Sequence, residues 1–124
     1  MGHCQSWWDR KRADMGDEAF RKWNADRRKM YRHLIRDEFL QEYGGKCKCC
    51  GETEPAFLCL DHINGTGAAH RKQFCPDRGS RGGNATQLLE DLKRRGWPKD
   101  EYQILCYNCN NAKAKLGKCP HERA

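Results

Sequence analysis

The chain has 124 residues, of which 33% are charged and only 37% are hydrophobic, and its mean hydropathy is −1.08. No apolar run approaches the roughly 20 residues that cross a membrane, and the first residues lack the apolar core of a secretory signal. We therefore expect one small cytoplasmic domain with a helical extension and no membrane association. A chain this small and polar buries a limited core, so an additional stabilising link is expected.

Charge and cysteine content narrow the class of partner and the redox compartment. The formal net charge is +7, which favours a polyanionic partner, nucleic acid above all, although a basic surface can also serve solubility alone. There are nine cysteines and no export signal, and reduced cysteines in such a chain are more often metal ligands than disulfide partners. An odd cysteine count indicates the same.

The first third of the chain predicts a helix behind an irregular arm. Residues 1–16 are polar and irregular, and we expect them to be loosely ordered. Residues 17–43 predict an amphipathic helix that Asp17 caps and Gly44-Gly45 ends. Its basic face is either solvated or in contact with DNA. The apolar stripe contains Phe20, Trp23, Tyr31, Leu34, Ile35 and Phe39.

The rest of the chain predicts short strands and helices, so the expected fold class is α+β. Residues 56–60 lead into Asp61-His62 and predict a strand, and residues 102–105 predict a second one. A Gly-rich stretch over residues 65–83 predicts a loop. Asn84 caps a helix that ends at Gly96-Trp97-Pro98, and a final helix over residues 110–116 stops at Gly117. The predicted domains are 1–43, an arm with a helix, and 44–124.

Two Cys-x-x-Cys turns form the most specific pattern, Cys47 with Cys50 and Cys106 with Cys109. Each turn points two sulfurs at one ion, so two turns complete a tetrahedral zinc site. The long separation between the turns costs little, because closure entropy grows only with the logarithm of loop length. A redox pair is the competing interpretation, but no thioredoxin-like βαβ pattern accompanies it. Cys49, between two ligands, can replace one of them.

The other cysteines carry weaker predictions. Cys4, Cys59 and Cys75 are interpreted as structural or incidental. Cys119-Pro-His121 near the end of the chain is interpreted as a free tail, with a second metal site as the alternative.

Asp61, His62 and Asn110 are the candidate catalytic residues. Asp61 and His62 can serve one site only where the strand ends or bends, which Gly65 permits, and Asn110 follows the last predicted zinc ligand. A carboxylate and an amide oxygen suit a hard cation, Mg²⁺ or Mn²⁺, and a neutral histidine beside it can take a proton from water. Together they suit phosphodiester hydrolysis. Taken singly, an asparagine at position 110 is more often a helix cap, and Asp61-His62 can be a hydrogen-bonded turn.

Three segments, KCKCCGE at 46–52, LDHINGTG at 60–67 and ILCYNCNNAK at 104–113, together resemble the HNH (ββα-metal) endonucleases. The similarity is strongest to small phage-type members and to phage recombination endonucleases. It implies a β-hairpin and a helix around one divalent cation, with His62 as general base and Asp61 and Asn110 as ligands of that cation. It also implies DNA as substrate, products with 5′-phosphate and 3′-hydroxyl ends, and, for a phage protein, the cytoplasm of a bacterial host cell.

Three features depart from the family pattern. The family asparagine that orients the base falls on Glu101, with Asn64 and Asn84 as alternatives, and the final family position is Asn110, as in the recombination branch. The segment 67–99 is longer than in compact members. It supplies basic candidates for phosphate contacts, namely His70, Arg71, Lys72, Lys93, Arg94 and Arg95.

These basic residues have alternative interpretations. His70 is also a candidate active-site group, or else a surface histidine. The cluster at residues 93–95 equally suits a helix C-terminus, where the dipole favours cations.

The predicted function is therefore a metal-dependent DNA endonuclease with a structural zinc ion. The alternative is a zinc-containing module that binds nucleic acid without cutting it. A monomer and a homodimer are both compatible with the sequence.

Overall fold

The computed structural model describes residues 6–74 and 84–123 of the chain. By its internal contacts the chain divides into two compact units, residues 1–34 and residues 35–124. The second unit is a small mixed domain of helices and a two-stranded sheet, which confirms the α+β class at this level. Within the described segments, every helix is too short or too polar to cross a membrane.

In the first unit, α1 (Trp7–Met15) is a regular helix where the sequence predicted irregular structure. The hydroxyl of Ser6 accepts a hydrogen bond from the Asp9 N–H at 3.1 Å, and the Asp9 carboxylate accepts from the Ser6 N–H at 3.2 Å. This capping box satisfies two N–H groups that a helix start otherwise leaves unpaired. The two tryptophans that begin α1 pack against Trp23, with ring centroids about 6 Å apart. The prediction of an irregular arm was wrong because it rested on the polar composition and took no account of the capping box or of the tryptophan cluster.

The long helix α2 (Asp17–Glu42) confirms the predicted amphipathic helix. It ends at Glu42, shortly before Gly44 and Gly45, whose φ angles of 94° and 68° lie in the left-handed region that glycine adopts without strain. Two residues of the predicted apolar stripe, Tyr31 and Leu34, are exposed, at 47% and 61%. Residues 35–42, the C-terminal turns of α2, belong to the second compact unit.

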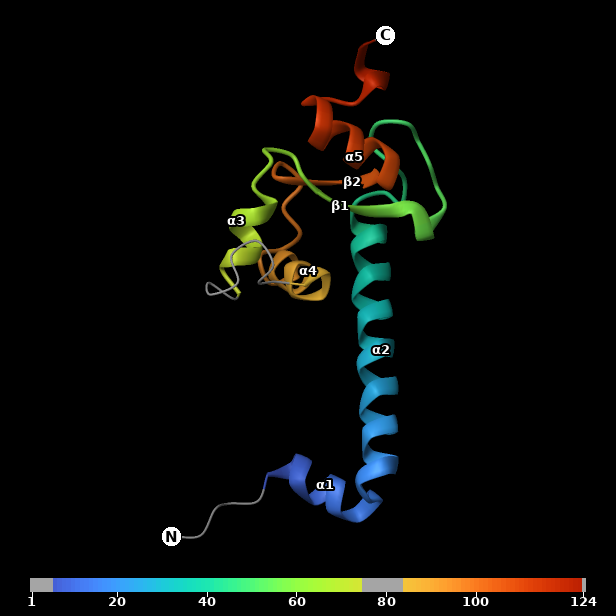
Figure 1. The fold of residues 1–124 in the computed structure, drawn as a ribbon, viewed down its shortest axis with the longest axis vertical. Coiled ribbons are helices and arrows are strands. Elements are labelled where there is room, and N and C mark those ends of the chain that lie inside the picture. Colours follow the sequence, from blue (N-terminus) through green and yellow to red (C-terminus); the bar gives the residue numbers. More distant parts are fainter. Residues whose placement is uncertain (1–5, 75–83, 124) are drawn as a thin grey trace. The chain divides into compact units, whose positions relative to one another are not determined.

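The sheet of the second unit is one antiparallel pair, β1 (Leu58–His62) and β2 (Tyr102–Cys106). Leu58 lies opposite Cys106 and His62 opposite Tyr102. The helix α5 (Tyr107–Leu116) follows β2 directly and packs against both strands (Figure 1). The start of α5 therefore lies beside the start of β1, and Lys113, nearer the C-terminus of α5, contacts the end of β1.

The core of the second unit joins α2, the sheet and α4 (Ala85–Arg94). Its most buried apolar side chains, each at most 2% exposed, include Ile35, Phe39, Leu58, Leu92 and Ile104. Truncating such a side chain to alanine typically costs about 2–5 kcal/mol. Because Ile35 and Phe39 belong to this core, the compact unit begins inside α2, before the domain boundary at 43/44 that the sequence analysis expected.

The segment between the strands contains two helices. Residues 67–72 form α3 (Gly67–Lys72), so the prediction of a continuous loop is wrong there. Residues 75–83 of that predicted loop, with Cys75, lie outside the described residues, as does Cys4. The predicted cap of α4 is confirmed, since the Asn84 side chain accepts from the Gln87 N–H at 2.9 Å.

Candidate functional site

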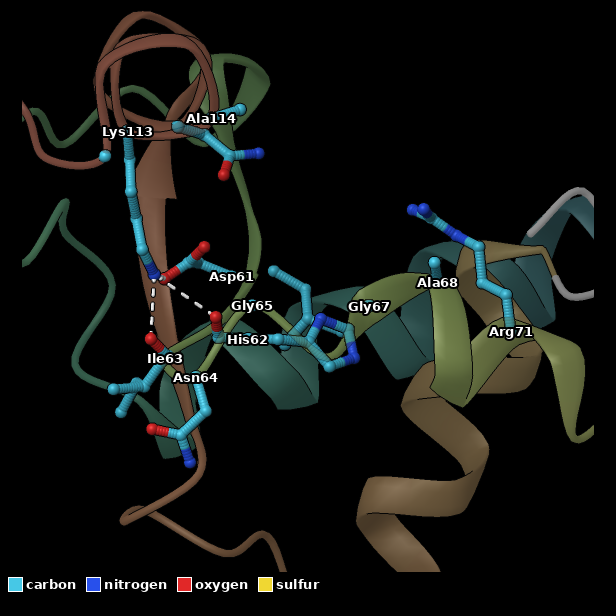
Figure 2. A pocket seen from close by; sticks show the side chains of 13 residues that line it. Asp61, His62, Ile63, Asn64, Gly65, Gly67, Ala68, Arg71, Lys113 and Ala114 are labelled. Carbon is cyan, nitrogen blue, oxygen red and sulfur yellow. Dashed lines mark hydrogen bonds and ion pairs between the residues drawn. The ribbon is translucent and has the colours of Figure 1, made fainter.

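Asp61 and His62 are the last two residues of β1, where the strand bends into a turn. The Gly65 N–H donates to the His62 carbonyl at 2.9 Å, and Gly65 has a φ of 71°, which favours glycine. Asp61, His62 and Asn110 all line one open hollow between the end of β1, α3 and α5 (Figure 2). The bend thus brings both strand residues to one site, as the sequence analysis required.

The hollow has a volume of about 630 Å³, within the roughly 300–1,000 Å³ that ligand pockets occupy. Arg71 from α3 and Lys113 from α5 also line it (Figure 2). Two basic side chains therefore accompany the three predicted catalytic residues.

Lys113 occupies a position that suits a cation. Its Nζ donates to Asp61 Oδ2 at 2.7 Å and to the carbonyl oxygens of His62 and Ile63, each at 3.1 Å (Figure 2). Gln103 Nε2 also donates to Asp61 Oδ2, at 2.7 Å. Neither residue was predicted from the sequence, although Gln103 pairs with Asp61 across the sheet and Lys113 lies three residues after Asn110, on the same helix face.

Asn110 lies in the first turn of α5 and does not cap it. The cap is Cys106, whose sulfur accepts from the Cys109 N–H at 3.4 Å. The Asn110 amide donates through Nδ2 to Cys59 Sγ at 3.4 Å. The helix-cap interpretation of Asn110 is therefore wrong, and Cys59 helps to orient the amide group.

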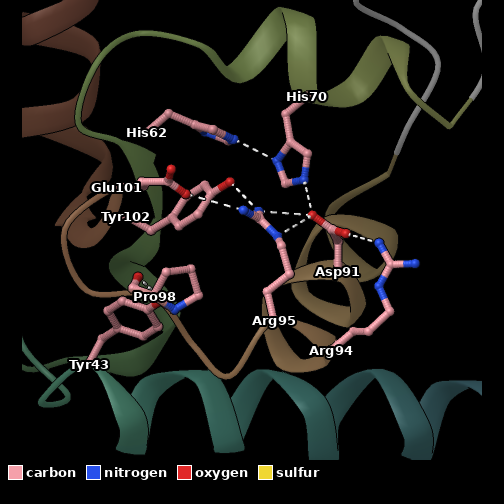
Figure 3. A network of polar contacts seen from close by, with 9 residues as sticks. All are labelled: Tyr43, His62, His70, Asp91, Arg94, Arg95, Pro98, Glu101 and Tyr102. Atoms are coloured by element: carbon pink, nitrogen blue, oxygen red, sulfur yellow. Dashed lines mark hydrogen bonds and ion pairs between the residues drawn. The ribbon is translucent and has the colours of Figure 1, made fainter.

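The ring of His62 is held by a buried row of polar side chains (Figure 3). His62 Nε2 lies 2.8 Å from His70 Nδ1, and His70 Nε2 lies 2.8 Å from Asp91 Oδ2. All three side chains are buried, and Arg94 and Arg95 form ion pairs with the Asp91 carboxylate. Each ring therefore has a defined partner on at least one nitrogen.

The charge on Asp91 decides which nitrogens carry protons. Burial raises the pKa of Asp91, but hydrogen bonds from His70 and Arg94 and the charge of Arg95 outweigh burial and lower the pKa. An ionised Asp91 accepts the N–H of His70 Nε2, so His70 Nδ1 accepts the N–H of His62 Nε2. His62 Nδ1 is then left with a free lone pair.

Two further observations concern this ring nitrogen. Burial, followed by His70 and Arg71, lowers the pKa of His62 to about 4, so the ring is neutral near neutral pH. Nδ1 lies next to Gly67, where a β-carbon would come within 3.3 Å of it. Glycine at position 67 therefore keeps that side of the ring open.

The structure corrects the predictions for the residue that orients His62. Glu101 forms an ion pair with Arg95 at 3.1 Å, Asn84 caps α4, and Asn64 is exposed at the rim of the hollow. His70 takes the orienting position instead. The prediction that His70 contacts DNA is wrong, because its side chain is buried.

The remaining predicted phosphate contacts divide into two groups. Arg71 lines the hollow and Lys72 is exposed on the same helix. Lys93 pairs with Glu38 at 2.9 Å, and Arg94 and Arg95 pair with Asp91, which matches a structural role at the end of α4.

Asp91 was not predicted from the sequence, although the apolar pattern of α4 could have identified it. It lies three residues after Leu88 and next to Leu92, so it falls on the buried face of the helix. A carboxylate on an apolar face requires a partner.

The two Cys-x-x-Cys turns come together at the end of the sheet where Cys106 pairs with Leu58, away from the end that carries His62. The sulfurs of Cys47, Cys50, Cys106 and Cys109 all lie within 4.8 Å of one another, and this cluster could hold a metal such as zinc. Cys50 Sγ and Cys106 Sγ are 3.7 Å apart. Zinc–sulfur bonds of about 2.3 Å in a tetrahedron separate the sulfurs by about 3.8 Å. Cys49 does not belong to this set.

The thiols of this cluster differ in their proton affinity. Burial raises the pKa of Cys47, but backbone N–H groups of Cys50, Cys106 and Cys49 outweigh burial and lower the pKa to about 6. Burial and the neighbouring thiols raise the pKa of Cys109. Adjacent thiolates repel one another, so a divalent cation would relieve the cost of ionising the whole set.

Comparison of the chain with protein-family models, with curated proteins and with solved structures gave no match. Function is therefore inferred from the motifs and geometry of this chain alone.

Proposed function

We propose that the chain is a metal-dependent DNA endonuclease that hydrolyses phosphodiester bonds. One observation carries the proposal: Asp61, His62 and Asn110 line one open hollow, and a buried carboxylate orients the histidine. The resemblance of three motifs to the HNH endonucleases supports the same activity. A formal net charge of +7 suits a polyanionic substrate.

His62 is the general base in this proposal. Its Nδ1 takes a proton from a water molecule, whose oxygen then attacks the phosphorus atom. His70 and Asp91 are positioning residues, since they act by keeping the proton of the resting ring on Nε2.

Asp61 and Asn110 provide hard oxygen donors that fit Mg²⁺ or Mn²⁺. Both contacts of the Asp61 carboxylate involve Oδ2, so Oδ1 is the oxygen offered to a cation. When bound, the cation supplies positive charge at the scissile phosphate and at the departing 3′ oxygen. Arg71 adds a positive side chain that positions DNA through its phosphates without reading sequence.

The four cysteines of the paired turns are proposed to hold one structural zinc ion. Cys106 caps α5 and Cys109 lies in its first turn, directly before Asn110. The Lys48 N–H also donates to the Ile104 carbonyl at 2.9 Å, which joins the first turn to β2. Zinc at this point fixes the start of α5, and with it Asn110, against β1, where Asn110 contacts Cys59.

The test is cleavage of supercoiled plasmid DNA by the zinc-loaded protein in Mg²⁺ or Mn²⁺. We expect nicked or linear product from the wild type and a rate about 10²- to 10⁴-fold lower from His62→Ala, the range that a general base contributes. His33→Ala is the matched control, because His33 is exposed on α2 in the other compact unit. Circular dichroism and zinc content establish that each variant is folded.

Two outcomes contradict the proposal. A wild-type protein that binds DNA but leaves it intact in every divalent cation is a binding module and no nuclease. A His62→Ala variant that cuts as fast as the wild type removes the role assigned to His62.

A further inference from the structure

A second set of metal-binding side chains lies beside the first and shares one residue with it. The ligand atoms of Cys49, Cys109, Cys119 and His121 all lie within 4.8 Å of one another. His121 Nδ1 is 3.6 Å from Cys49 Sγ, 3.5 Å from Cys109 Sγ and 3.1 Å from Cys119 Sγ. In tetrahedral zinc sites, bonds of about 2.3 Å to sulfur and 2.0–2.1 Å to nitrogen separate such ligands by about 3.6 Å. Two distances match this value and the third lies about half an ångström below it.

The fold of the C-terminal segment creates this set. Gly117 ends α5 with a φ of 82°, and its N–H donates to the Lys113 carbonyl at 2.9 Å. The chain then turns back, buries Cys119 and presents His121 from a short 3₁₀ turn, Pro120–Arg123. The expectation that this segment is a free tail is therefore wrong.

The placement of His121 points to a ligand role. Core packing accounts for the burial of Cys119, which belongs to the apolar cluster. It does not account for His121, which is exposed and still directs one ring nitrogen toward three sulfurs. Thiols are weak hydrogen-bond partners, so three of them offer an exposed imidazole less than water does. A metal ion bound to the same nitrogen and sulfurs explains the arrangement.

We propose that Cys49, Cys109, Cys119 and His121 bind a second zinc ion, with the Cys109 sulfur shared between the two ions. Three sulfurs and one imidazole form a recognised zinc donor set. The proposal rests on the zinc ion assigned to the paired cysteine turns, and it does not depend on DNA cleavage. It also assigns the consecutive residues Cys49 and Cys50 to different ions.

Charge balance favours sharing. One zinc ion with four thiolates carries −4 + 2 = −2. The second ion adds +2 and the thiolates of Cys49 and Cys119 add −2, so the total stays at −2. If the second ion instead used the sulfur of a further cysteine in place of Cys109, that thiolate would add one more negative charge in a half-buried environment.

The second ion would act on the helix that carries the candidate catalytic residues. Cys109 lies in the first turn of α5, and Cys119 follows its end at Gly117. An ion bound to both residues joins the two ends of α5, between which Asn110 and Lys113 project into the hollow. The C-terminal segment is then part of the metal centre.

The direct test is the zinc content of the purified full-length chain, measured by elemental analysis and by native mass spectrometry. We expect two zinc ions per chain in the wild type and one in the double variant Cys119→Ser/His121→Ala. The double variant is needed because a water molecule can replace a single lost ligand. His33→Ala is the matched control and keeps both ions, since His33 is exposed in the other compact unit.

Sharing of Cys109 has a separate spectroscopic test. Replacement of zinc by an NMR-active cadmium isotope is expected to give two cadmium signals, split by scalar coupling through the common sulfur. In Cys119→Ser/His121→Ala one signal and the splitting disappear together. Circular dichroism confirms that the variant remains folded through the first site.

Each alternative outcome is decisive. One zinc ion in the wild type, or two in the double variant, overturns the second site. Two uncoupled cadmium signals overturn the sharing of Cys109. A wild type without any zinc removes both metal proposals, and two zinc ions in a chain that leaves DNA intact contradict the nuclease alone.

Discussion

At the scale of single residues, the two ring nitrogens of His62 differ in their surroundings. Nε2 faces His70 inside the protein, and Nδ1 lies beside Gly67. An isolated histidine exchanges its proton between both nitrogens, so only a fixed partner selects the nitrogen that carries it. The chain His62, His70, Asp91 supplies that partner through two contacts of 2.8 Å.

We expect Asp91→Asn to lower kcat about 10- to 100-fold, the usual cost of losing such an outer partner, with little change in KM for DNA. The asparagine amide can donate to His70 Nε2, so that His70 carries its proton on Nδ1 and donates it to His62 Nε2. The proton of His62 then moves to Nδ1. Nitrogen NMR of the imidazole rings measures this change of tautomer directly. Glu90→Gln, on the exposed face of α4, is the control. An unchanged His62 tautomer in Asp91→Asn would falsify the positioning role of His70 and Asp91.

Lys113 provides a second prediction at this scale. Its ammonium contacts Asp61 Oδ2 at 2.7 Å, so it repels a divalent cation bound to the same carboxylate. Unit charges about 4 Å apart interact by about 1–4 kcal/mol near a protein surface. We expect Lys113→Met to bind Mn²⁺ about tenfold more tightly in zinc-loaded protein, as measured by electron paramagnetic resonance. Lys115→Met, exposed on the same helix, serves as control, and equal affinity in both variants would contradict the competition.

At the scale of elements, short helices carry the site residues and local caps hold those helices in place. Cys106 caps α5 and Asn84 caps α4, so each helix start is determined within a few residues. These caps matter beyond the helices themselves. α4 delivers Asp91 to the histidine row, and α5 delivers Asn110 and Lys113 to the hollow.

The cap of α4 can be tested by a stability measurement. Asn84→Ala removes the side-chain acceptor for the Gln87 N–H and should lower the free energy of unfolding by about 1 kcal/mol. Urea denaturation of the zinc-loaded protein measures the change as a lower midpoint. Asn84→Ser retains an acceptor and should lie close to the wild type. Equal midpoints for wild type and Asn84→Ala would show that the cap contributes nothing.

At the scale of the whole molecule, the second compact unit has a small core beside a cluster of cysteines. The sheet has two strands, and a two-stranded hairpin is marginal in water without other packing. The cysteine turns join the segment after α2 to β2 and α5. Metal binding at these turns would therefore connect parts of the chain that are distant in sequence.

We accordingly expect removal of zinc by a chelator to unfold residues 35–124, because binding free energy at such a site is also folding free energy. Methyl NMR signals of the core residues Leu58, Leu92 and Ile104 should lose their dispersion and recover when zinc is added back. Retention of dispersed methyl signals in zinc-free protein would show that the apolar core suffices.

Local sequence patterns predicted the elements that are stabilised by interactions between residues close together in the chain. The apolar spacing of α2, the Asn84 cap and the strand before Asp61-His62 all depend on neighbours within a few residues, and each was predicted. The paired cysteine turns were predicted for the same reason. The α1 helix was missed because the local Ser6–Asp9 capping box was overlooked and because its tryptophans pack against Trp23 on another helix.

By itself, the sequence determined that the chain has paired Cys-x-x-Cys turns and an Asp-His pair at a strand end. Tertiary structure alone decided which partners those residues acquire. It placed Asp91 beside His70, 21 residues away in the sequence, left Cys49 out of the cluster formed by the paired turns, and brought His121 close to three sulfurs. Hydrogen bonds and metal coordination act over about 3 Å in space, so their partners follow from how distant elements pack and not from spacing along the chain.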